Sequence, residues 1–436
     1  MARPGCGTAE RAGLSRAIIR GEGRVVTTAG TLPEFFDPDM LEEPFAWYQE
    51  ALARGPVATA GGGTVHLLLS HKIVSEAAGR PDELSSDFGA MMRGARADDA
   101  QIAAIEADGW PQVDTMLTAD PPVHTRFRKL VNLAFSMPRV NAMEDEIRGV
   151  VGGLLDSLAG RESIEIVHDF AVPLPVAVIA AQIGMNRDEA ANVKRWSDAF
   201  ADRLGGMATR ERELECAHLV VEFQQQVKRL IDARRDGNGP NDLLGAIVNA
   251  TIEGERPLDD AEILSVVQQL MVAGNETTTS TIAGGLLLLI RNPEQEAKVR
   301  ADRSLIPNMV EEMLRLLSPT AGLWRVAAKD TMVGDVAVKR GEMVMLRFAA
   351  ANRDPAVFPE PDRFDVERKN ARSHLAFGRG IHMCVGNMLA RKELAVTFEE
   401  LFARYDRFEL TEGANDFRHV PNRLLRGLAA LHVRLR

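Results

Sequence analysis

Cys384 lies where a thiol could serve as a metal ligand. It follows a glycine-rich turn at residues 377–380 and precedes residues 387–391, whose pattern predicts the start of a helix. A cysteine at a helix start faces free backbone N–H groups and the positive end of the helix dipole, which favour the thiolate over the thiol. A stable thiolate in such a loop is suited to bind a metal ion. The alternative is a structural cysteine in a glycine turn.

The glycines around Cys384 leave room for a broad, flat ligand, because a backbone without Cβ can approach a ligand closely. Haem iron is the metal that takes a single thiolate within a flat pocket. Zinc is a weaker candidate. Cys384 and His382 could supply two ligands, but Cys6 and Cys216 are remote in sequence and lack the spacing of a zinc site.

Residues 377–386, with the sequence FGRGIHMCVG, resemble the haem-binding signature of the cytochrome P450 superfamily, Phe-Gly-x-Gly-x-His-x-Cys-x-Gly, at every fixed position. The resemblance covers the chain from roughly residue 36 to the C-terminus. It implies a mainly α fold, a triangular helical domain with small β-sheets. It also implies that Cys384 is the proximal ligand of haem b, donating electron density that favours O–O cleavage. Further cofactor contacts are implied for Phe377, Gly378 and Gly386.

A long helical segment, predicted over residues 259–290, carries the second chemical group. Its centre reads Ala-Gly-Asn-Glu-Thr-Thr over residues 273–278, which is a poor helix sequence because glycine costs about 1 kcal/mol relative to alanine. A local deformation for function is therefore predicted. Ala273 and Thr277 share one face, and the Thr277 hydroxyl can donate to the carbonyl four residues earlier, which loosens the helix and opens a groove for water.

This segment resembles the Ala-Gly-x-Asp/Glu-Thr motif of the family, whose implied task is to deliver protons to the co-substrate O2. Thr277 and Glu276 are the implied catalytic residues, a hydroxyl and an acid joined by ordered water. Ala273 and Gly274 are expected beside the haem. The alternative is close helix packing through these two small residues, with a solvated Glu276. Asn275 occupies the variable position, and its effect on the water network stays open.

The two propionates of haem need cationic or hydrogen-bonding partners when they are buried. His124 and Arg128 share one face of a predicted helix that opens with proline punctuation. The resemblance implies that these two residues, together with Arg325 and His382, contact the propionates. Each of them would otherwise be a solvated surface group.

Glu312 and Arg315 have the Glu-x-x-Arg spacing of the family and are followed by Leu-Ser-Pro, as in its members. Alone, this spacing indicates little, because exposed helices often pair charges three residues apart for a few tenths of a kcal/mol. The resemblance implies a buried ion-pair network that locks the cysteine loop, residues 377–386, to the core. Arg363 and Arg368 are both candidates for its third member.

Length, charge and cysteine content restrict the class of protein. The 436 residues include 52 basic and 62 acidic ones, and the net charge of −10 argues against a nucleic-acid binder. Three widely separated cysteines predict no disulfide framework, so a reducing cytoplasm is the default location. A monomer is the expected state. The most apolar stretch, 170–185, is interrupted by prolines and too short for a membrane span. Residues 1–30 are expected to be a flexible extension and residues 31–436 one catalytic domain.

Helical periodicity dominates from about residue 124 onward. A hairpin is predicted around Gly341, between β-rich runs at 331–338 and 343–347. Other elements follow from short local patterns: a helix at 44–52, a strand at 65–69, a helix beginning near Asp242, and an irregular connection at 351–375.

These features predict a haem-thiolate monooxygenase that inserts one oxygen atom from O2 into a small-to-medium apolar substrate, by hydroxylation or epoxidation. Electrons from NAD(P)H would arrive through a separate ferredoxin, or flavodoxin, and a reductase. A local basic concentration would receive this acidic partner, unless its members are scattered solubilising charges. The members are Arg128, Lys129, Arg139, Arg372, Arg379, Arg391 and Lys392.

Two other functions would also keep Cys384. A peroxygenase would use hydrogen peroxide and typically would not need Glu276 and Thr277, and a non-enzymatic haem sensor or carrier has no use for a proton-delivery helix. The substrate itself is not identified, since a terpenoid, an aromatic compound, a steroid or a fatty acid would each suit an apolar pocket. That pocket is expected to draw on 89–116, on 190–215, and on Met91, Met92, Leu270, Ala273, Leu323, Trp324 and Leu424.

Overall fold

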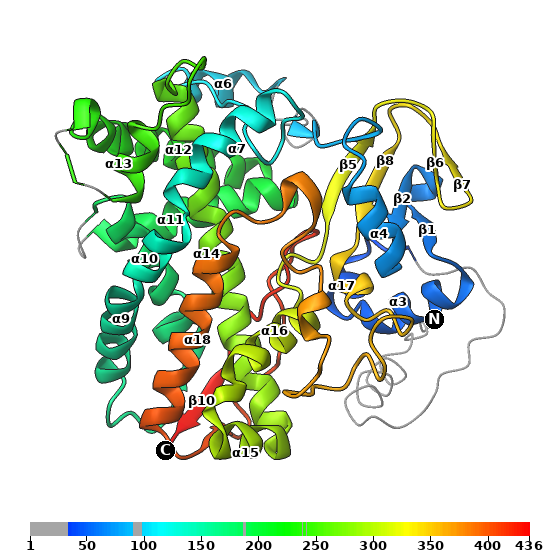
Figure 1. The fold of residues 1–436 in the computed structure, drawn as a ribbon, viewed down its shortest axis with the longest axis vertical. Coiled ribbons are helices and arrows are strands. Elements are labelled where there is room, and N and C mark those ends of the chain that lie inside the picture. The colour runs from blue at the N-terminus through cyan, green and yellow to red at the C-terminus, as the bar shows by residue number, and fades with distance from the viewer. Residues whose placement is uncertain (1–33, 90–97, 186–188, 238, 241) are drawn as a thin grey trace, which may run out of the picture. The chain divides into compact units, whose positions relative to one another are not determined.

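Most helices gather in one region, most strands lie beside them together with shorter helices, and the C-terminal strand lies among the helices (Figure 1). The computed structural model describes residues 34–89, 98–185, 189–237, 239–240 and 242–436. The segment Glu34–Arg436 forms one compact unit, and the predicted extension at 1–30 lies outside the described residues. The predicted mainly α fold with small sheets is confirmed.

The helices have the following bounds: α2 Pro38–Glu42, α3 Phe45–Arg54, α4 His71–Ala78, α6 Ala100–Glu106, α7 Val123–Ala134, α8 Met137–Ala142, α9 Glu144–Ser157, α10 Pro173–Gln182, α11 Ala190–Gly205, α12 Arg210–Asp232, α13 Leu243–Val248, α14 Asp260–Arg291, α15 Pro293–Ala301, α16 Ile306–Leu317, α17 Phe348–Ala351 and α18 Asn387–Arg404. Shorter helical turns lie at Gly61–Gly63, Val167–Ala171, Arg235–Gly237, Arg303–Leu305, Ala371–Ser373 and Gly380–His382. The helices predicted at 44–52, 259–290 and near Asp242 are confirmed as α3, α14 and α13, and 351–375 is irregular as expected.

The strands of the described residues form three small sheets. The largest has the order β1 (Val57–Ala60), β2 (Val65–Leu68), β8 (Met343–Leu346), β5 (Leu323–Ala327) and β3 (Leu84–Ser85). The second has the order β4 (Ile164–Glu165), β10 (His432–Leu435) and β9 (Phe408–Leu410), and the third pairs β6 (Thr331–Val333) with β7 (Val336–Val338). In the largest sheet β2 and β8 run parallel and the other neighbours run antiparallel.

The prediction of a hairpin around Gly341 is wrong. The hairpin lies inside the first β-rich run, where Val333 pairs with Val336 across Gly334 and Asp335. Gly334 has a φ of 57°, a left-handed conformation that such a two-residue turn requires and that glycine adopts without strain. β8, the strand after Gly341, pairs instead with β5 and β2.

α14 is the central element of the helical region and contacts α10, α11, α16 and α18. Its start is fixed by a capping box, in which the side chains of Asp259 and Glu262 each accept a hydrogen bond from the other residue's backbone N–H. Gly284 and Gly285 allow a close approach to α16, because a Cβ at either position would lie 2.7 Å from a side-chain atom of that helix. The C-terminal half of α14 therefore packs closely against α16.

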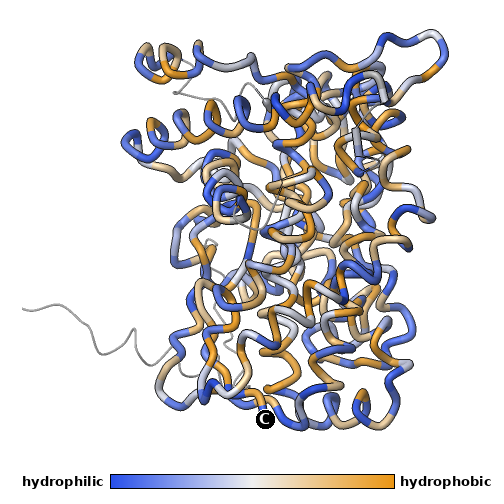
Figure 2. Tube along the Cα trace, turned by 90° about the vertical axis from the view of Figure 1, so that its left-hand side faces the viewer, coloured by the Kyte–Doolittle hydropathy of each residue, from blue (hydrophilic) through white to orange (hydrophobic). Residues whose placement is uncertain are grey.

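Buried apolar side chains form the core between these helices. One cluster includes Ile282, Leu286, Met313 and Phe398 from α14, α16 and α18. Figure 2 shows that apolar residues concentrate in the inner segments, whereas hydrophilic residues occupy the peripheral turns. Within the described part of the chain, no helix combines the length and apolar character needed to cross a membrane.

Candidate active site

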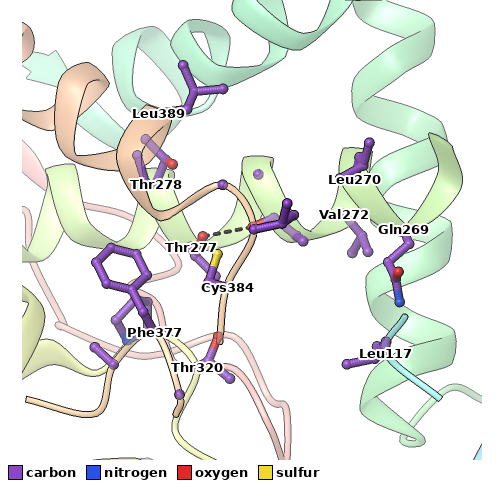
Figure 3. A pocket seen from close by; sticks show the side chains of 18 of the residues that line it. Leu117, Gln269, Leu270, Val272, Thr277, Thr278, Thr320, Phe377, Cys384 and Leu389 are labelled. Atoms are coloured by element: carbon purple, nitrogen blue, oxygen red, sulfur yellow. Dashed lines mark hydrogen bonds between the residues drawn. The ribbon is translucent and has the colours of Figure 1, made fainter. Parts of the chain in front are cut away.

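A large cavity lies between α14, the cysteine loop and strand β5 (Figure 3). Its wall contains Cys384 on one side and the α14 residues Ala273, Gly274 and Thr277 on another. Most of the remaining wall is apolar, with residues such as Leu117, Ile179, Leu204, Leu270, Val272, Leu346 and Leu424. The structure thus brings the two motifs, more than 100 residues apart in sequence, to one cavity.

Cys384 is held by hydrogen bonds to its own loop and from the first side chain of α18. Its N–H donates to the Phe377 carbonyl at 2.8 Å, and Asn387 Nδ2 donates to the Cys384 carbonyl at 2.7 Å. Burial raises the pKa of the Cys384 thiol, although the Gly386 N–H and the positive charge of Arg128 act in the opposite direction. The helix-start argument therefore underestimated burial, and a bound metal ion is needed to displace the proton at neutral pH.

Two arginines of the wall that are at least half-buried, Arg325 and Arg128, form no ion pair within the described residues. Arg325 is 4% exposed and donates to the Trp324 carbonyl at 2.7 Å, and burial lowers its pKa to about 10. Arg128 is half-buried, and burial lowers its pKa as well. A buried charge without a partner is strongly unfavourable, so this part of the cavity suits an anionic ligand.

His124 is a further polar group of this region. It is 2% exposed, and neither ring nitrogen forms a hydrogen bond of normal geometry, although the Ile381 backbone lies near the ring. Burial, followed by the charge of Arg128, lowers the pKa of His124. A neutral imidazole has one N–H to donate, and an acceptor from a ligand would satisfy it.

His382 has protein partners on both ring nitrogens. Nδ1 lies 3.0 Å from the Met116 carbonyl, which can only accept, so Nδ1 carries the proton. Nε2 lies 2.9 Å from Ser86 Oγ, and burial together with the charge of Arg325 lowers the pKa of His382 to about 3. His382 is therefore a neutral side chain that links the cysteine loop to two distant segments. Because both of its ring nitrogens already have protein partners, neither is free to bind a propionate.

The residues present fit a haem group. They offer a thiol for iron, two arginines and a histidine for carboxylates, and glycines that leave space for a flat ring. A Cβ on Gly274 would meet nothing within 4 Å, and a Cβ on Gly378 or Gly386 would have its nearest neighbour at 3.8 Å. The open sides of these glycines are thus free for a ligand.

α14 matches its prediction in one respect and departs from it in two. Thr277 Oγ1 donates to the Ala273 carbonyl at 2.8 Å, as expected. However, α14 is continuous through residues 273–278, so the predicted deformation is wrong, because a threonine can make this bond within a regular helix. Glu276 does not line the cavity. It is half-buried and lies where Lys194 and Asp198 of α11 act on it, and burial raises its pKa.

β5 decides which of its neighbouring residues reach the cavity. Leu323 and Arg325 line the wall, whereas Trp324 lies 5.9 Å from Phe36 between ring centroids and is not part of the wall. The expectation that Trp324 lines the pocket is wrong, because successive residues of a strand point to opposite faces. The expected residues Leu270, Ala273 and Leu424 do line it, and Met91 and Met92 lie outside the described residues.

Comparison with known proteins identifies the family. A family model described as Cytochrome P450 matches residues 189–418, which is more than half of the chain. The chain belongs to the cytochrome P450 family. P450 enzymes are haem-thiolate monooxygenases that use O2, and this chemistry fits the cavity described above.

Individual relatives extend the match over nearly the whole chain. Cytochrome P450 107B1 of Saccharopolyspora erythraea is 34% identical over 93% of this chain and 99% of its own length. The 6-deoxyerythronolide B hydroxylase of the same organism is 38% identical over 73% of this chain and 78% of its own length. The structure of myxobacterial cytochrome P450 CYP267B1 in complex with myristic acid has a TM-score of 0.81 and 34% identity, covering 93% of this chain and 100% of that chain. The P450 is therefore an enzyme of the monooxygenase class, rather than a haem carrier.

The Glu-x-x-Arg network of the P450 is completed by Arg368. Glu312 accepts hydrogen bonds from Arg315 Nε at 2.7 Å and from Arg368 Nε at 2.9 Å. The other candidate, Arg363, contributes its carbonyl to both arginines, and its guanidinium pairs with the exposed Glu360 at 3.0 Å. The three members of the network are buried, in agreement with the implied structural role.

A second buried network, which the sequence analysis missed, supports the cysteine loop. Glu311 is 1% exposed and accepts hydrogen bonds from His374 Nε2 at 2.9 Å and from Arg391 Nε at 2.7 Å. Burial opposes ionisation, but these bonds prevail and lower the pKa of Glu311 to about 2. The Arg391 guanidinium also lies 4.4 Å above the Phe377 ring, so this ion pair fixes a residue of the haem signature.

Glu393 of α18 is a buried carboxyl in the cavity wall that sequence reasoning also missed. It is 5% exposed and accepts a hydrogen bond from Thr278 Oγ1 at 3.3 Å. Burial raises its pKa to about 8, against the smaller effect of that bond, so the group is mainly protonated at neutral pH. Its spacing of four and eight residues from Thr397 and Leu401, which are buried on the same helix, is the signal that could have indicated an inward position.

The raised pKa of Glu393 predicts a pH dependence of stability. Between the unfolded value of 4.5 and the folded value of about 8, the native state keeps a proton that the unfolded state releases, so the free energy of unfolding falls as pH rises through this range. Glu393→Gln should remove this slope and stabilise the protein at pH 8 by on the order of 1–3 kcal/mol. Denaturant titrations of the haem-loaded enzyme between pH 5 and pH 8 would measure it. Glu412→Gln, an exposed substitution, is the control, and an unchanged slope in the Glu393 variant contradicts the assignment.

Proposed function

We propose that this P450 is a haem b monooxygenase that inserts one atom of O2 into a small-to-medium apolar substrate, by hydroxylation or epoxidation. Electrons come from NAD(P)H through a separate ferredoxin, or flavodoxin, and a reductase. The observation that carries the proposal is one cavity whose wall includes Cys384, Thr277 and, unpaired within the described part of the chain, Arg128 and Arg325. When bound there, haem supplies the iron at which O2 is activated.

The residues that would hold the haem come from α7, β5, α14 and the loop that contains Cys384. Cys384 would bind the iron, and Arg128, Arg325 and His124 would contact the propionates. Phe377, Gly378 and Gly386 would border the ring on the cysteine side, and Ala273 and Gly274 on the α14 side. His382 would orient the cysteine loop, and its hydrogen bonds to Ser86 and Met116 support that role.

Proton delivery is assigned to α14. Thr277 would hold a proton at Oγ1 inside the cavity, and Glu276 would resupply it from the side of α11. The raised pKa of Glu276 supports this assignment, because burial shifts this carboxyl toward the pH range in which an acid donates and regains a proton efficiently. The separation of Glu276 from the cavity wall requires water between the two groups, as in the predicted arrangement.

An exposed surface over the cysteine loop supports docking of the electron donor. Its apolar members are Leu133, Met137, Met383 and Met388, which are between 38% and 58% exposed. Lys129 and Arg379 are exposed beside them and form no ion pair within the described residues. Arg391 and Lys392, by contrast, are paired with Glu311 and Glu144, so the basic character is weaker than the sequence indicated. An acidic ferredoxin with an apolar centre fits this surface.

Reconstitution tests the proposed function. The purified enzyme, a ferredoxin, a reductase and NADH are incubated with apolar compounds at low and high salt, and product is measured. Ferredoxin-dependent product that declines with salt is expected. Product that forms with hydrogen peroxide but never with the electron-transfer proteins would identify a peroxygenase instead.

Thr277→Ala tests the proton role. The variant should still consume NADH, but the product formed per NADH should fall by about tenfold or more, because reducing equivalents are lost as hydrogen peroxide. Ser280→Ala is the matched control, since Ser280 makes the same kind of bond to the carbonyl four residues earlier, at 2.7 Å, without lining the cavity. Full coupling in Thr277→Ala would exclude the assigned role.

A further inference from the structure

Gln269 is a polar side chain in an apolar part of the cavity wall. Figure 3 shows it beside Leu117, Leu270 and Val272, at the opposite end of the view from Phe377. The charged and ionisable groups of the wall come from other elements: Arg128, Arg325, Arg379, His382, Cys384 and Glu393. A polar group among apolar neighbours costs free energy unless a hydrogen bond compensates it, so its position calls for a partner.

One end of the Gln269 amide already has a partner. Thr115 Oγ1 donates to Gln269 Oε1 at 3.1 Å, and Thr115 is 3% exposed, so a buried hydroxyl fixes the acceptor end. The Nε2 group forms no hydrogen bond within the described part of the chain. It is therefore oriented as a donor at the cavity surface, and a ligand that displaces water from it must supply an acceptor.

The position of Gln269 on α14 sets a length for that ligand. Gln269 and Thr277 lie eight residues apart in one continuous helix, and a rise of 1.5 Å per residue separates them by about 12 Å along the axis. A molecule that reaches from one to the other must be elongated. Its body must be apolar, because Leu270, Val272 and Ala273 line the wall between them.

We infer that Gln269 determines specificity by donating a hydrogen bond to a neutral carbonyl oxygen at one end of an elongated apolar substrate. The carbon that is oxidised lies near the other end, roughly 12 Å away. A neutral amide donor suits a ketone or ester better than a carboxylate, which favours a cationic partner. The inference rests on the proposed function, because it names the substrate class of the same cavity.

Matched ligand pairs test this inference. The first pair is testosterone and the same steroid skeleton without the ring-A ketone, and the second is a linear methyl ketone and the alkane of equal length. Binding to the haem-loaded enzyme is measured by the shift of the haem absorption spectrum. We expect the ketone of at least one pair to bind roughly fivefold to tenfold more tightly than its partner, as one hydrogen bond predicts.

Gln269→Met should abolish this ketone preference while leaving the affinity of the ketone-free compounds unchanged. Gln268→Met is the matched control, because Gln268 is the adjacent half-buried glutamine and does not line the cavity. Thr115→Val should reduce the preference in part, by freeing the amide. Product analysis should show oxidation spreading over more carbons in Gln269→Met.

The outcomes separate this inference from the proposed function. If neither pair shows a ketone preference, or if Gln269→Met weakens both members equally, the inference is overturned. The proposed function survives that result as long as ferredoxin-dependent product still forms. A wild-type enzyme that forms no product with any apolar compound overturns the proposed function itself.

Discussion

The Cys384→Ala variant should lose the thiolate-type spectrum of the reduced carbon monoxide complex, and its turnover should fall by roughly three orders of magnitude or more. Cys384 is the cysteine that lines the cavity, and the alanine variant leaves no sulfur there to bind iron. Neither His382 nor Glu393 replaces it, since the histidine is engaged on both nitrogens and the carboxyl bonds to Thr278. Absorption spectra and product assays on equal haem concentrations provide the measurement.

Cys216→Ala is the control for this experiment. Cys216 is buried in α12 within a separate apolar cluster and does not line the cavity. Its thiol packs as a small apolar group, so the variant should keep the wild-type spectrum and activity. A thiolate-type spectrum that persists in Cys384→Ala, or disappears in Cys216→Ala, would contradict the ligand assignment.

Glu312→Gln should destabilise the protein by about 3–5 kcal/mol, because the buried Arg315 and Arg368 lose their shared counter-charge. Both side chains of the Glu312–Arg315 pair have a relative exposure of 0%. Denaturant titration of the haem-loaded enzyme measures the change. If the variant does not accumulate in soluble form, the Arg368→Met variant, which leaves one arginine with its carboxylate, should fold with a smaller loss.

The matched control uses a second Glu-x-x-Arg pair of the same chain. Glu360 and Arg363 have the same spacing and an N···O distance of 3.0 Å, but their side chains are 70% and 52% exposed. Glu360→Gln should change the free energy of unfolding by less than about 1 kcal/mol, because solvent screens exposed pairs. Equal effects of the two substitutions would show that burial does not determine the contribution of this motif.

Local features of the site could be predicted from the sequence. The helix start after Cys384, the long α14 and the Thr277 hydroxyl bond depend on residues within a few positions of one another. Short-range pattern rules apply there, and the structure confirms these elements. Arg368 shows where such prediction ends. The sequence left Arg363 and Arg368 as candidates for the third member of the Glu312 network, and only the tertiary contact with Glu312 identifies Arg368.

Features that depend on distant partners could not be predicted in this way. The hydrogen bonds of His382 reach Ser86 and Met116, which are more than 260 residues away, and no local pattern indicates them. Glu393 and Gln269 are polar residues whose helix propensity is the same whether they face solvent or the cavity. Their inward position follows from the packing of α18 and α14 against other elements, and packing also explains why Glu276 faces α11.

The alternation of side chains along β5 supplies the cavity with both an apolar residue and a cation. Leu323 and Arg325 point inward, so one strand contributes both an apolar wall position and a propionate-site cation. Its register is fixed on both edges, by β8 and by β3. Inserting or deleting one residue before Leu323 would reverse every side chain of the strand, turning Trp324 inward and the arginine outward. Over evolution, this strand can therefore change its side chains to suit new substrates, but it cannot change its length by one residue.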